Sequence, residues 1–239
     1  MTLEEKIQNY HTSETAKQLI RQTKIVLLVG VSGAGKDTIK HKLLDRGGYH
    51  HIVSHTTRPL RLNQGVMETD GVEYHFIDLP TAEAMIDNHG YIEVNHYSGN
   101  VYGTSVAEIQ LAHDEGKAAI TDMEVQGVDE YMQIAPQSVK PIFILPPNYE
   151  VWQERLNRRY VASDAIVSDN ITKRLKTSEF ELEQALAKNY FYFVINDDID
   201  QAVAAIEEIV HSPDNASAYR SEESKDLARS LLADVSAKH

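Results

Sequence analysis

The sequence predicts an α/β fold in which a parallel sheet carries helices on both faces. Short apolar segments rich in β-branched residues alternate with longer amphipathic segments along most of the 239 residues, which is typical of parallel strands joined by helices. One of these strands runs into a glycine-rich turn that opens a helix, an arrangement that favours anion binding. No stretch approaches the roughly 18 apolar residues that a membrane-spanning helix requires.

The expected elements follow this alternation in chain order. We expect strands at residues 25–29, 51–54, 72–78, 91–97, 118–123, 139–145 and 191–195. We expect helices at residues 3–22, 80–87, 105–115 and 199–210. A further helix runs from residue 36 to the glycine pair at 47–48, another begins near residue 149, and a long amphipathic helix ends at about residue 188. A polar, loop-like segment is expected at 158–170, and one further surface helix after residue 212.

Three parts are expected along the chain. Residues 24–211 form the α/β core, residues 1–23 an N-terminal helical extension, and residues 212–239 a polar, helical C-terminal tail. Within the core, residues 55–104 interrupt the alternation, and we interpret them as an inserted lobe of mixed β/α structure. Residues 156–172 are polar and basic, and we interpret them as a lid.

Composition excludes several classes of function. The formal net charge of -13 argues against general nucleic-acid affinity, although a local basic cluster can still bind a small anion. The absence of cysteine excludes disulfides, thiolate catalysis and Cys-ligated zinc. The N-terminal segment MTLEEKIQNY lacks the apolar region of a signal peptide. The sequence therefore predicts a cytoplasmic protein with no membrane or nucleic-acid partner, as a monomer or homodimer.

The chain is organised around residues 24–38, KIVLLVGVSGAGKDT. Glycines let backbone N–H groups approach phosphate oxygens closely, and the lysine adds a charge for the β- and γ-phosphates. A plain glycine-rich turn is the structural alternative, but the strand before it and the helix after it favour a nucleotide-binding P-loop. The candidate ATP-binding residues here are Gly30, Ser32, Gly33, Ala34, Gly35, Lys36, Asp37 and Thr38.

The residue after the P-loop lysine departs from the strict pattern. Asp37 stands where that pattern has the Ser or Thr that ligates Mg²⁺, and Thr38 comes one position later. Asp122, at a strand end, is placed like a carboxylate that holds Mg²⁺ directly or through water. Asp37 and Asp122 are therefore the candidate magnesium ligands, with a helix N-cap as the alternative role of Asp122. The histidines at 50, 51 and 55 lack a helical ligand pair and do not indicate a metal site.

Two groups of basic residues indicate phosphate chemistry. Arg58 and Arg61, in SHTTRPLR, can pair bidentately with phosphate oxygens, and Tyr74 and Tyr102 can add hydroxyl donors. Basic residues in and beside the lid can close over transferring phosphates; these are Arg155, Arg158, Arg159, Lys173 and Arg174. A solvated charged surface is the alternative for both groups.

Glu93 lies within the apolar strand segment YIEV, where a carboxylate needs a partner. Guanine offers one, because its N1–H and N2 amino group are adjacent donors that a single carboxylate can accept together. Thr104 can donate to guanine O6, and Glu124 follows a strand end from which it can also reach N2. A structural salt bridge is the alternative role of Glu93.

Together these motifs resemble those of the guanylate kinase family over residues 24–210. GVSGAGKDT is similar to the family P-loop, SHTTRPLR to its SxTTRxxR motif, and DGVEYHFI to its G-x-x-Y-x-F strand. YIEVNHYSGNVYGT is the most specific stretch, TDMEVQG resembles D-x-D-x-Q-G, and NDDID resembles the loop near adenine. The resemblance implies a P-loop NTPase fold whose inserted lobe, residues 55–104, binds a nucleoside monophosphate.

The resemblance also implies a reaction and residue roles. The reaction is Mg²⁺-dependent transfer of the ATP γ-phosphoryl group to GMP, giving GDP and ADP, with ATP as co-substrate. Guanine contacts would come from Ser54, Glu93, Thr104 and Glu124, and contacts to the GMP phosphate from Arg58, Arg61, Tyr74 and Tyr102. Arg159 and Arg174 would be lid-side phosphate ligands, and Asn196 would lie near adenine. The residues that neutralise charge during transfer would be Lys36, Arg58, Arg159 and Arg174.

Several departures indicate a divergent member and leave alternatives open. Asp37 replaces a hydroxyl residue, Glu124 stands where the family has Asp, and Tyr160 replaces a lid glycine. One alternative is a kinase for another phosphorylated acceptor, such as dGMP, a modified guanylate or ribose 1,5-bisphosphate, and the guanine-reading residues argue against the ribose substrate. The other is a non-catalytic binding module, against which the intact Lys36 and glycines argue.

Overall fold

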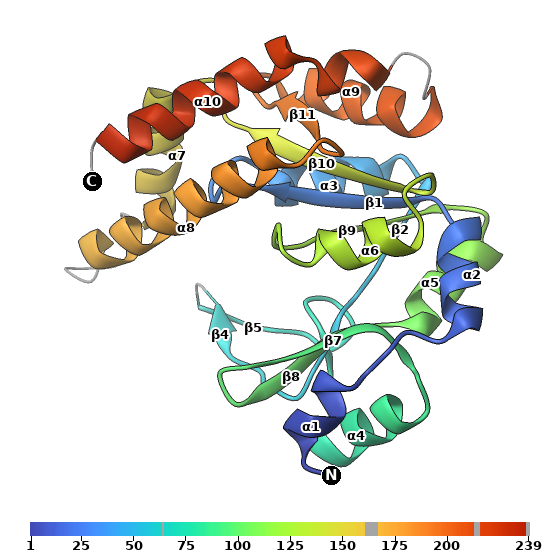
Figure 1. Cartoon of the computed structure of the whole chain (residues 1–239). Coiled ribbons are helices and arrows are strands. Elements are labelled where there is room, and N and C mark those ends of the chain that lie inside the picture. The colour runs from blue at the N-terminus through green and yellow to red at the C-terminus, as the bar shows by residue number, and fades with distance from the viewer. Residues whose placement is uncertain (64, 161–166, 213–215, 238–239) are drawn as a thin grey trace. The chain divides into compact units, whose positions relative to one another are not determined.

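The computed structural model describes residues 1–63, 65–160, 167–212 and 216–237 (Figure 1). The side chains of residues 63, 159, 160 and 167–173 also lie outside the described part. The chain divides into two compact units. The lobe unit comprises Met1–Ile25, Tyr49–Thr121 and Gln133–Ser138, and the P-loop unit comprises Val26–Gly48, Asp122–Met132 and Val139–His239.

The P-loop unit contains the buried parallel strands that the sequence predicts. Its strands, in spatial order, are β11 (Tyr192–Ile195), β10 (Val139–Leu145) and β1 (Ile25–Gly30). Strands β10 and β11 pair in parallel, and every residue of β1 is buried, as expected for a strand covered on both faces. The helices assigned mainly to this unit are α3 (Lys36–Asp45), α6 (Val128–Ile134), α7 (Tyr149–Tyr160), α8 (Val167–Ala187), α9 (Ile199–His211), the 3₁₀ turn η1 (Ala216–Arg220) and α10 (Glu222–Ala237).

The lobe unit combines a parallel strand pair with a mixed sheet. Strands β2 (Tyr49–His51) and β9 (Ala118–Asp122) pair in parallel. The four-stranded sheet has the order β6 (His75–Phe76), β3 (His55–Thr56), β8 (Asn100–Ser105), β7 (Tyr91–Tyr97), with β3–β6 parallel and β3–β8 and β7–β8 antiparallel. A separate hairpin joins β4 (Leu62–Asn63) to β5 (Val66–Met67). The helices are α1 (Leu3–Gln8), α2 (Glu14–Gln22), α4 (Leu79–Asp87) and α5 (Val106–Asp114).

These units confirm the predicted α/β class, with a parallel sheet, helices and a mixed inserted lobe. Strand β10 and the start of α3 lie where the sequence predicts them. Within the described part of the chain, no helix combines the length and the apolar composition that a bilayer crossing requires.

The N-terminal stretch is not the single helix expected over residues 3–22. Helix α1 ends at Gln8, and α2 begins at Glu14 behind the predicted N-cap Ser13, whose side chain accepts from the Ala16 N–H. The residues between them leave the helical path because Tyr10 and Thr12 bond to the backbone of β7. Long-range contacts therefore override local helix propensity here.

Two predicted strands have other bounds than expected, and in each region a carboxylate accepts a backbone N–H. The strand expected at 51–54 is β2, Tyr49–His51, and the Val53 N–H beyond it donates to Glu108 Oε2 at 2.9 Å. The strand expected at 72–78 is reduced to β6, where the Phe76 N–H donates to Asp70 Oδ1 at 2.8 Å.

The ends of the lid and the C-terminal tail are more regular than expected. The loop-like prediction for 158–170 is wrong at both ends, because α7 continues to Tyr160 and α8 begins at Val167; residues 161–166 lie outside the described part. The tail helix α10 buries Ala228, Leu231 and Val235 and packs on α8 and β11. It therefore belongs to the hydrophobic core of the P-loop unit.

Candidate active site

The P-loop connects β1 to α3 through two glycines with left-handed backbone conformations. Gly33 and Gly35 have φ values of 83° and 96°, which β-carbon-bearing residues rarely adopt. A Cβ on Gly35 would also lie 2.2 Å from Asn196 Nδ2. Helix α3 begins at Lys36, and its N-cap Gly35 provides no side-chain hydrogen bond. The first N–H groups of α3 are therefore suited to bind an anion such as a phosphate.

A cavity of about 620 Å³ lies at this helix N-terminus within the P-loop unit. Nine of the predicted site residues line it, namely Ser32, Gly33, Gly35, Lys36, Asp37, Thr38, Asp122, Glu124 and Arg174. Thr177, Ser178 and Glu181 of α8 complete the lining. The structure therefore brings together most of the residues assigned to ATP and magnesium.

Three predicted ATP-site residues are not among those that line this cavity: Gly30, Ala34 and Asn196. Asn196 is buried, and its Nδ2 donates to the Ala34 carbonyl at 2.7 Å. The Asn196 side chain thus bonds to the P-loop backbone.

Two cations contact the P-loop. Lys36 Nζ donates to the carbonyl oxygen of Gly30 and, at 3.3 Å, to that of Val31. Arg174 Nη1 donates to Ser32 Oγ at 3.2 Å. Positive charge therefore lies beside the glycine loop, as phosphate binding requires. The Arg159 side chain lies outside the described residues.

Asp122 is held ionised beside the loop. Burial acts to raise the pKa of Asp122, but Lys40, whose Nζ lies 2.5 Å from Asp122 Oδ1, and Lys36 outweigh it and leave the pKa below its ordinary value. Among the described residues, no group of three or more His, Asp and Glu side chains is arranged to bind a metal. Asp37, Thr38 and Asp122 nevertheless offer carboxylate and hydroxyl oxygens, which fit Mg²⁺ bound partly by substrate phosphates.

Glu181 adds a titratable group that the sequence analysis did not select. Desolvation raises the pKa of Glu181, Lys36 opposes this effect and Glu124 adds to it, and together they bring the pKa to about 7. A carboxyl group that is half-protonated near neutral pH therefore lines the P-loop cavity.

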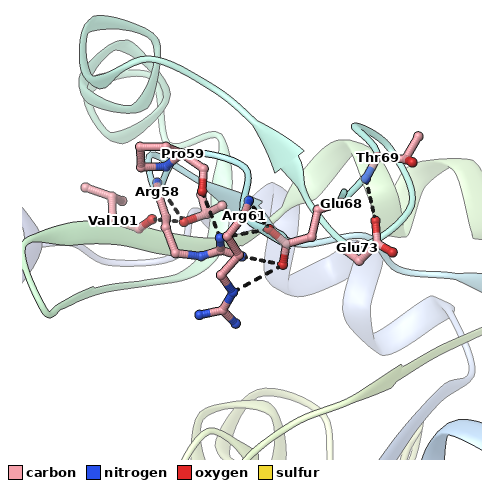
Figure 2. Close-up of polar contacts among 8 residues, drawn as sticks. Arg58, Pro59, Arg61, Glu68, Thr69, Glu73 and Val101 are labelled. Carbon is pink, nitrogen blue, oxygen red and sulfur yellow. Dashed lines mark hydrogen bonds and ion pairs between the residues drawn. The ribbon is translucent and has the colours of Figure 1, made fainter. Parts of the chain in front are cut away.

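In the lobe unit, Arg58 and Arg61 converge on one carboxylate, that of Glu68 (Figure 2). Arg58 donates from Nη1 and Nη2 to the two Glu68 oxygens, each at 2.8 Å. The Arg61 N–H donates to Glu68 Oε2 at 3.0 Å, and Arg61 Nε lies 3.5 Å from Oε1. Glu68 is buried, whereas the Arg61 side chain is 66% exposed.

Two predicted tyrosines complete this cluster. The Arg58 guanidinium lies 5.4 Å from the Tyr74 ring centroid and 5.5 Å from that of Phe76. The rings of Tyr74 and Tyr102 lie 6.0 Å apart, edge to face, and Tyr102, after Glu68, helps to raise the pKa of Arg58. The four residues predicted for the GMP phosphate, Arg58, Arg61, Tyr74 and Tyr102, are therefore close neighbours.

The predicted guanine-reading pair lies on adjacent strands of the same unit. Glu93 and Thr104 are opposite one another on β7 and β8, and the Thr104 N–H donates to Glu93 Oε1 at 2.9 Å. Asn95 Nδ2 donates to the other oxygen at 3.0 Å. Both of these hydrogen bonds to Glu93 come from neutral donors. Ser54, between β2 and β3, accepts the His75 N–H with its carbonyl oxygen at 2.9 Å.

Glu68 was missed because its role depends on a hairpin register. The ladder pairs Leu62 with Met67 and Asn63 with Val66, so Arg61 lies directly opposite Glu68. The glycine at position 65, with a φ of 83°, is the one local signal for this turn. Recognising the hairpin in the sequence would have predicted the cross-strand Arg–Glu pair.

Comparison with known proteins decides the family. A family model described as guanylate kinase matches residues 22–213. The chain belongs to the guanylate kinase family. The guanylate kinase of Thermus thermophilus is 36% identical over 181 residues, which cover 76% of this chain and 77% of that protein. The guanylate kinase of Brucella melitensis is 36% identical over 202 residues, covering 84% and 87%.

The fold agrees with this membership. The crystal structure of guanylate kinase from Anaplasma phagocytophilum matches with a TM-score of 0.56 at 24% identity, covering 86% of this chain and 90% of that one. All of the residues predicted for ATP belong to the P-loop unit, and those predicted for GMP belong to the lobe unit. Glu124 is the exception, because it belongs to the P-loop unit and lines its cavity.

Proposed function

We propose that this protein transfers the γ-phosphoryl group of ATP to GMP, giving ADP and GDP. The observation that carries the proposal is the P-loop cavity, which joins Lys36 and Arg174 to the carboxylate of Asp122 in a chain whose curated relatives are named guanylate kinase. The cavity supports binding of a nucleoside triphosphate, and family membership supports guanylate as the acceptor.

At the donor end, the ATP phosphates bind the N-terminus of α3. Lys36, which donates to the Gly30 and Val31 carbonyls, turns toward the β- and γ-phosphates. Arg174 and the lid residue Arg159 are proposed to meet the transferring group. Mg²⁺, held by Asp37 and Asp122 with Thr38 nearby, would neutralise charge on the β- and γ-phosphates.

At the acceptor end, the GMP phosphate binds the cluster of Arg58, Arg61, Tyr74 and Tyr102. Glu68 supports this cluster, because its two oxygens fix the plane of the Arg58 guanidinium while the Arg61 side chain stays exposed to a ligand. Glu93 accepts from guanine N1–H and N2, and Thr104 donates to O6. Ser54 and Glu124 are proposed as further base contacts.

In the chemical step, the protein forms no covalent bond with the transferred phosphoryl group. An oxygen of the GMP phosphate attacks the γ-phosphorus, and the bond to the bridging oxygen of ADP breaks in line with the attack. Lys36, Arg58, Arg159 and Arg174 stabilise the negative charge that shifts between donor and acceptor. Positioning and electrostatic stabilisation therefore supply most of the rate enhancement.

The test is product formation from Mg·ATP and GMP. We expect ADP and GDP in equal amounts, measured by chromatography, and a turnover reduced by roughly 10²–10³ in Lys36→Ala, because a preorganised charge at the transferring group is lost. Circular dichroism should show an unchanged fold in the variant. ADP formation without GDP would contradict the acceptor assignment, and undiminished turnover in Lys36→Ala would contradict the role of this lysine.

A further inference from the structure

The N-terminal arm, residues 1–13, is built into the core of the lobe unit. Leu3, Ile7 and Tyr10 pack against the buried cluster formed by Ala82, Ile86, Tyr91, Val94 and Val101. At the surface, Lys6 Nζ lies 2.7 Å from Asp87 Oδ2 and 3.6 Å from Glu83 Oε2, both on α4. The arm is therefore held in place by both apolar and ionic contacts.

The arm also covers the edge of the sheet that carries Glu93. Strand β7 is the last strand of the order β6-β3-β8-β7, and an edge strand presents backbone groups that no strand pairs. The Tyr10 hydroxyl donates to the Tyr91 carbonyl at 2.5 Å and accepts the N–H of the same residue at 3.0 Å. One hydroxyl thus satisfies both outward-facing backbone groups of Tyr91.

Next to Tyr91, β7 contains a bulge, and a second residue of the arm forms a hydrogen bond with the backbone of this bulge. Tyr91 lies opposite Ser105 and Glu93 opposite Thr104, so two steps along β7 match one along β8, and Ile92 is the extra residue. Thr12 Oγ1 donates to the Ile92 carbonyl at 2.7 Å. Bulges redirect the side chains that follow them, and the residue that follows this one is Glu93.

The other side of β7 leaves little room for movement. A Cβ on Gly103 of β8 would lie 2.7 Å from the Glu93 carbonyl oxygen and 2.8 Å from Tyr91 Cδ1, so the two strands approach closely. The Tyr91 side chain is fully buried, and its ring lies edge to face with that of Tyr10, 6.5 Å between centroids. The arm and Gly103 therefore confine the bulge from opposite edges of β7.

We propose that Tyr10 and Thr12 are positioning residues for guanine recognition. By holding the backbone of Tyr91 and Ile92, they fix the bulge that directs the Glu93 carboxylate toward the base. This inference rests on the proposed function, because it takes Glu93 as the group that reads guanine. It assigns the N-terminal arm a role in acceptor binding.

The first test removes the two hydroxyls while keeping the shape of the side chains. In the Tyr10→Phe/Thr12→Val double variant we expect the KM for GMP to rise about tenfold, from the loss of backbone hydrogen bonds at the bulge. The kcat and the KM for ATP should stay within about twofold of wild type. The matched control is Tyr97→Phe, at a 74% exposed position of the same strand, and it should leave all three constants unchanged.

The second test separates positioning from a general loss of lobe stability. IMP lacks the 2-amino group from which Glu93 is proposed to accept a hydrogen bond. The ratio of kcat/KM for GMP to that for IMP should therefore fall in the double variant. Glu93→Gln should lower the same ratio. Adding the two arm substitutions to Glu93→Gln should change the GMP KM less than about twofold, because coupled residues are non-additive.

The outcomes distinguish the inference from the proposed function. An unchanged GMP KM in Glu93→Gln would overturn the proposed guanine site and the role of the arm with it. A raised KM in Glu93→Gln, with the wild-type KM and GMP/IMP ratio in the double variant, would overturn only the role of the arm. Equal losses for GMP and IMP, following a lower melting temperature, would show a merely structural arm and also overturn the inference.

Discussion

Glu68 binds both arginines that the sequence assigns to the substrate phosphate. Its buried carboxylate makes a two-point contact with Arg58 and accepts the backbone N–H of Arg61. A buried carboxylate without such partners would be strongly unfavourable. The pair therefore has two consequences, a fixed guanidinium plane for ligand binding and a dependence of stability on pH.

The pH dependence follows from the direction of the pKa shift. Hydrogen bonding by Arg58, against the opposing effect of desolvation, lowers the pKa of Glu68 below 4.5. The folded state thus keeps this carboxylate ionised, so its contribution is fully present above pH 4.5 and is lost as the pH falls through the folded-state pKa. We expect Glu68→Gln to lower the melting temperature by roughly 3–10 °C at pH 7, and the difference from wild type to shrink as the pH falls below 4.5.

Differential scanning calorimetry between pH 3 and pH 7 measures this difference. Glu73→Gln is the matched control in the same loop, because the Glu73 carboxylate accepts the Thr69 N–H at 2.7 Å (Figure 2). A difference between wild type and Glu68→Gln that stays constant over the whole pH range would contradict the ionised Glu68–Arg58 pair.

Helix α8 contributes Glu181 to the P-loop cavity, together with Thr177 and Ser178. Desolvation sets the pKa of Glu181 at about 7, with Glu124 raising it and Lys36 lowering it. We expect the protonated form to be compatible with nucleotide phosphates in this cavity and the ionised form to repel them. ATP binding should therefore weaken as the pH rises through about 7.

We expect the wild-type KM for ATP to rise between pH 6.5 and 8.5, by at most about tenfold per pH unit for one proton. In Glu181→Gln that rise should be absent, and the KM for ATP at pH 8 should be severalfold lower than in wild type. Steady-state kinetics at saturating GMP measures both, with Glu183→Gln, an exposed position of α8, as the control. A wild-type pH profile in Glu181→Gln would rule out Glu181 as the titrating group.

The elements differ in how far the sequence predicts them. The segment that runs from β1 through the P-loop into α3 is predicted well because its signal is local, with a strand, glycines and a lysine within 15 residues. The break between α1 and α2 is not, because its cause is a bond between Tyr10 and Tyr91, 81 positions apart. The Val53 N–H, which the sequence places in a strand, likewise donates to Glu108, 55 positions away.

At the scale of the whole molecule, the residues predicted for the phosphate donor and for the acceptor belong mainly to different compact units. The predicted α/β class and family are confirmed. The residues that spacing alone could not reveal are Glu68, Glu181, Tyr10 and Thr12, because the role proposed for each depends on its tertiary surroundings. Their chemistry, a carboxylate or a hydroxyl, is too common in a sequence to indicate a role without that contact.

The measurement that tests the central claim most directly is the comparison of acceptors with Mg·ATP as donor. We predict that the kcat/KM for GMP exceeds those for AMP, UMP and ribose 1,5-bisphosphate by at least about 10²-fold, because a site built for the donors of guanine leaves its polar groups unpaired with other acceptors. Faster turnover of any of these other acceptors, or no turnover of GMP although GMP binds by calorimetry, would contradict the account.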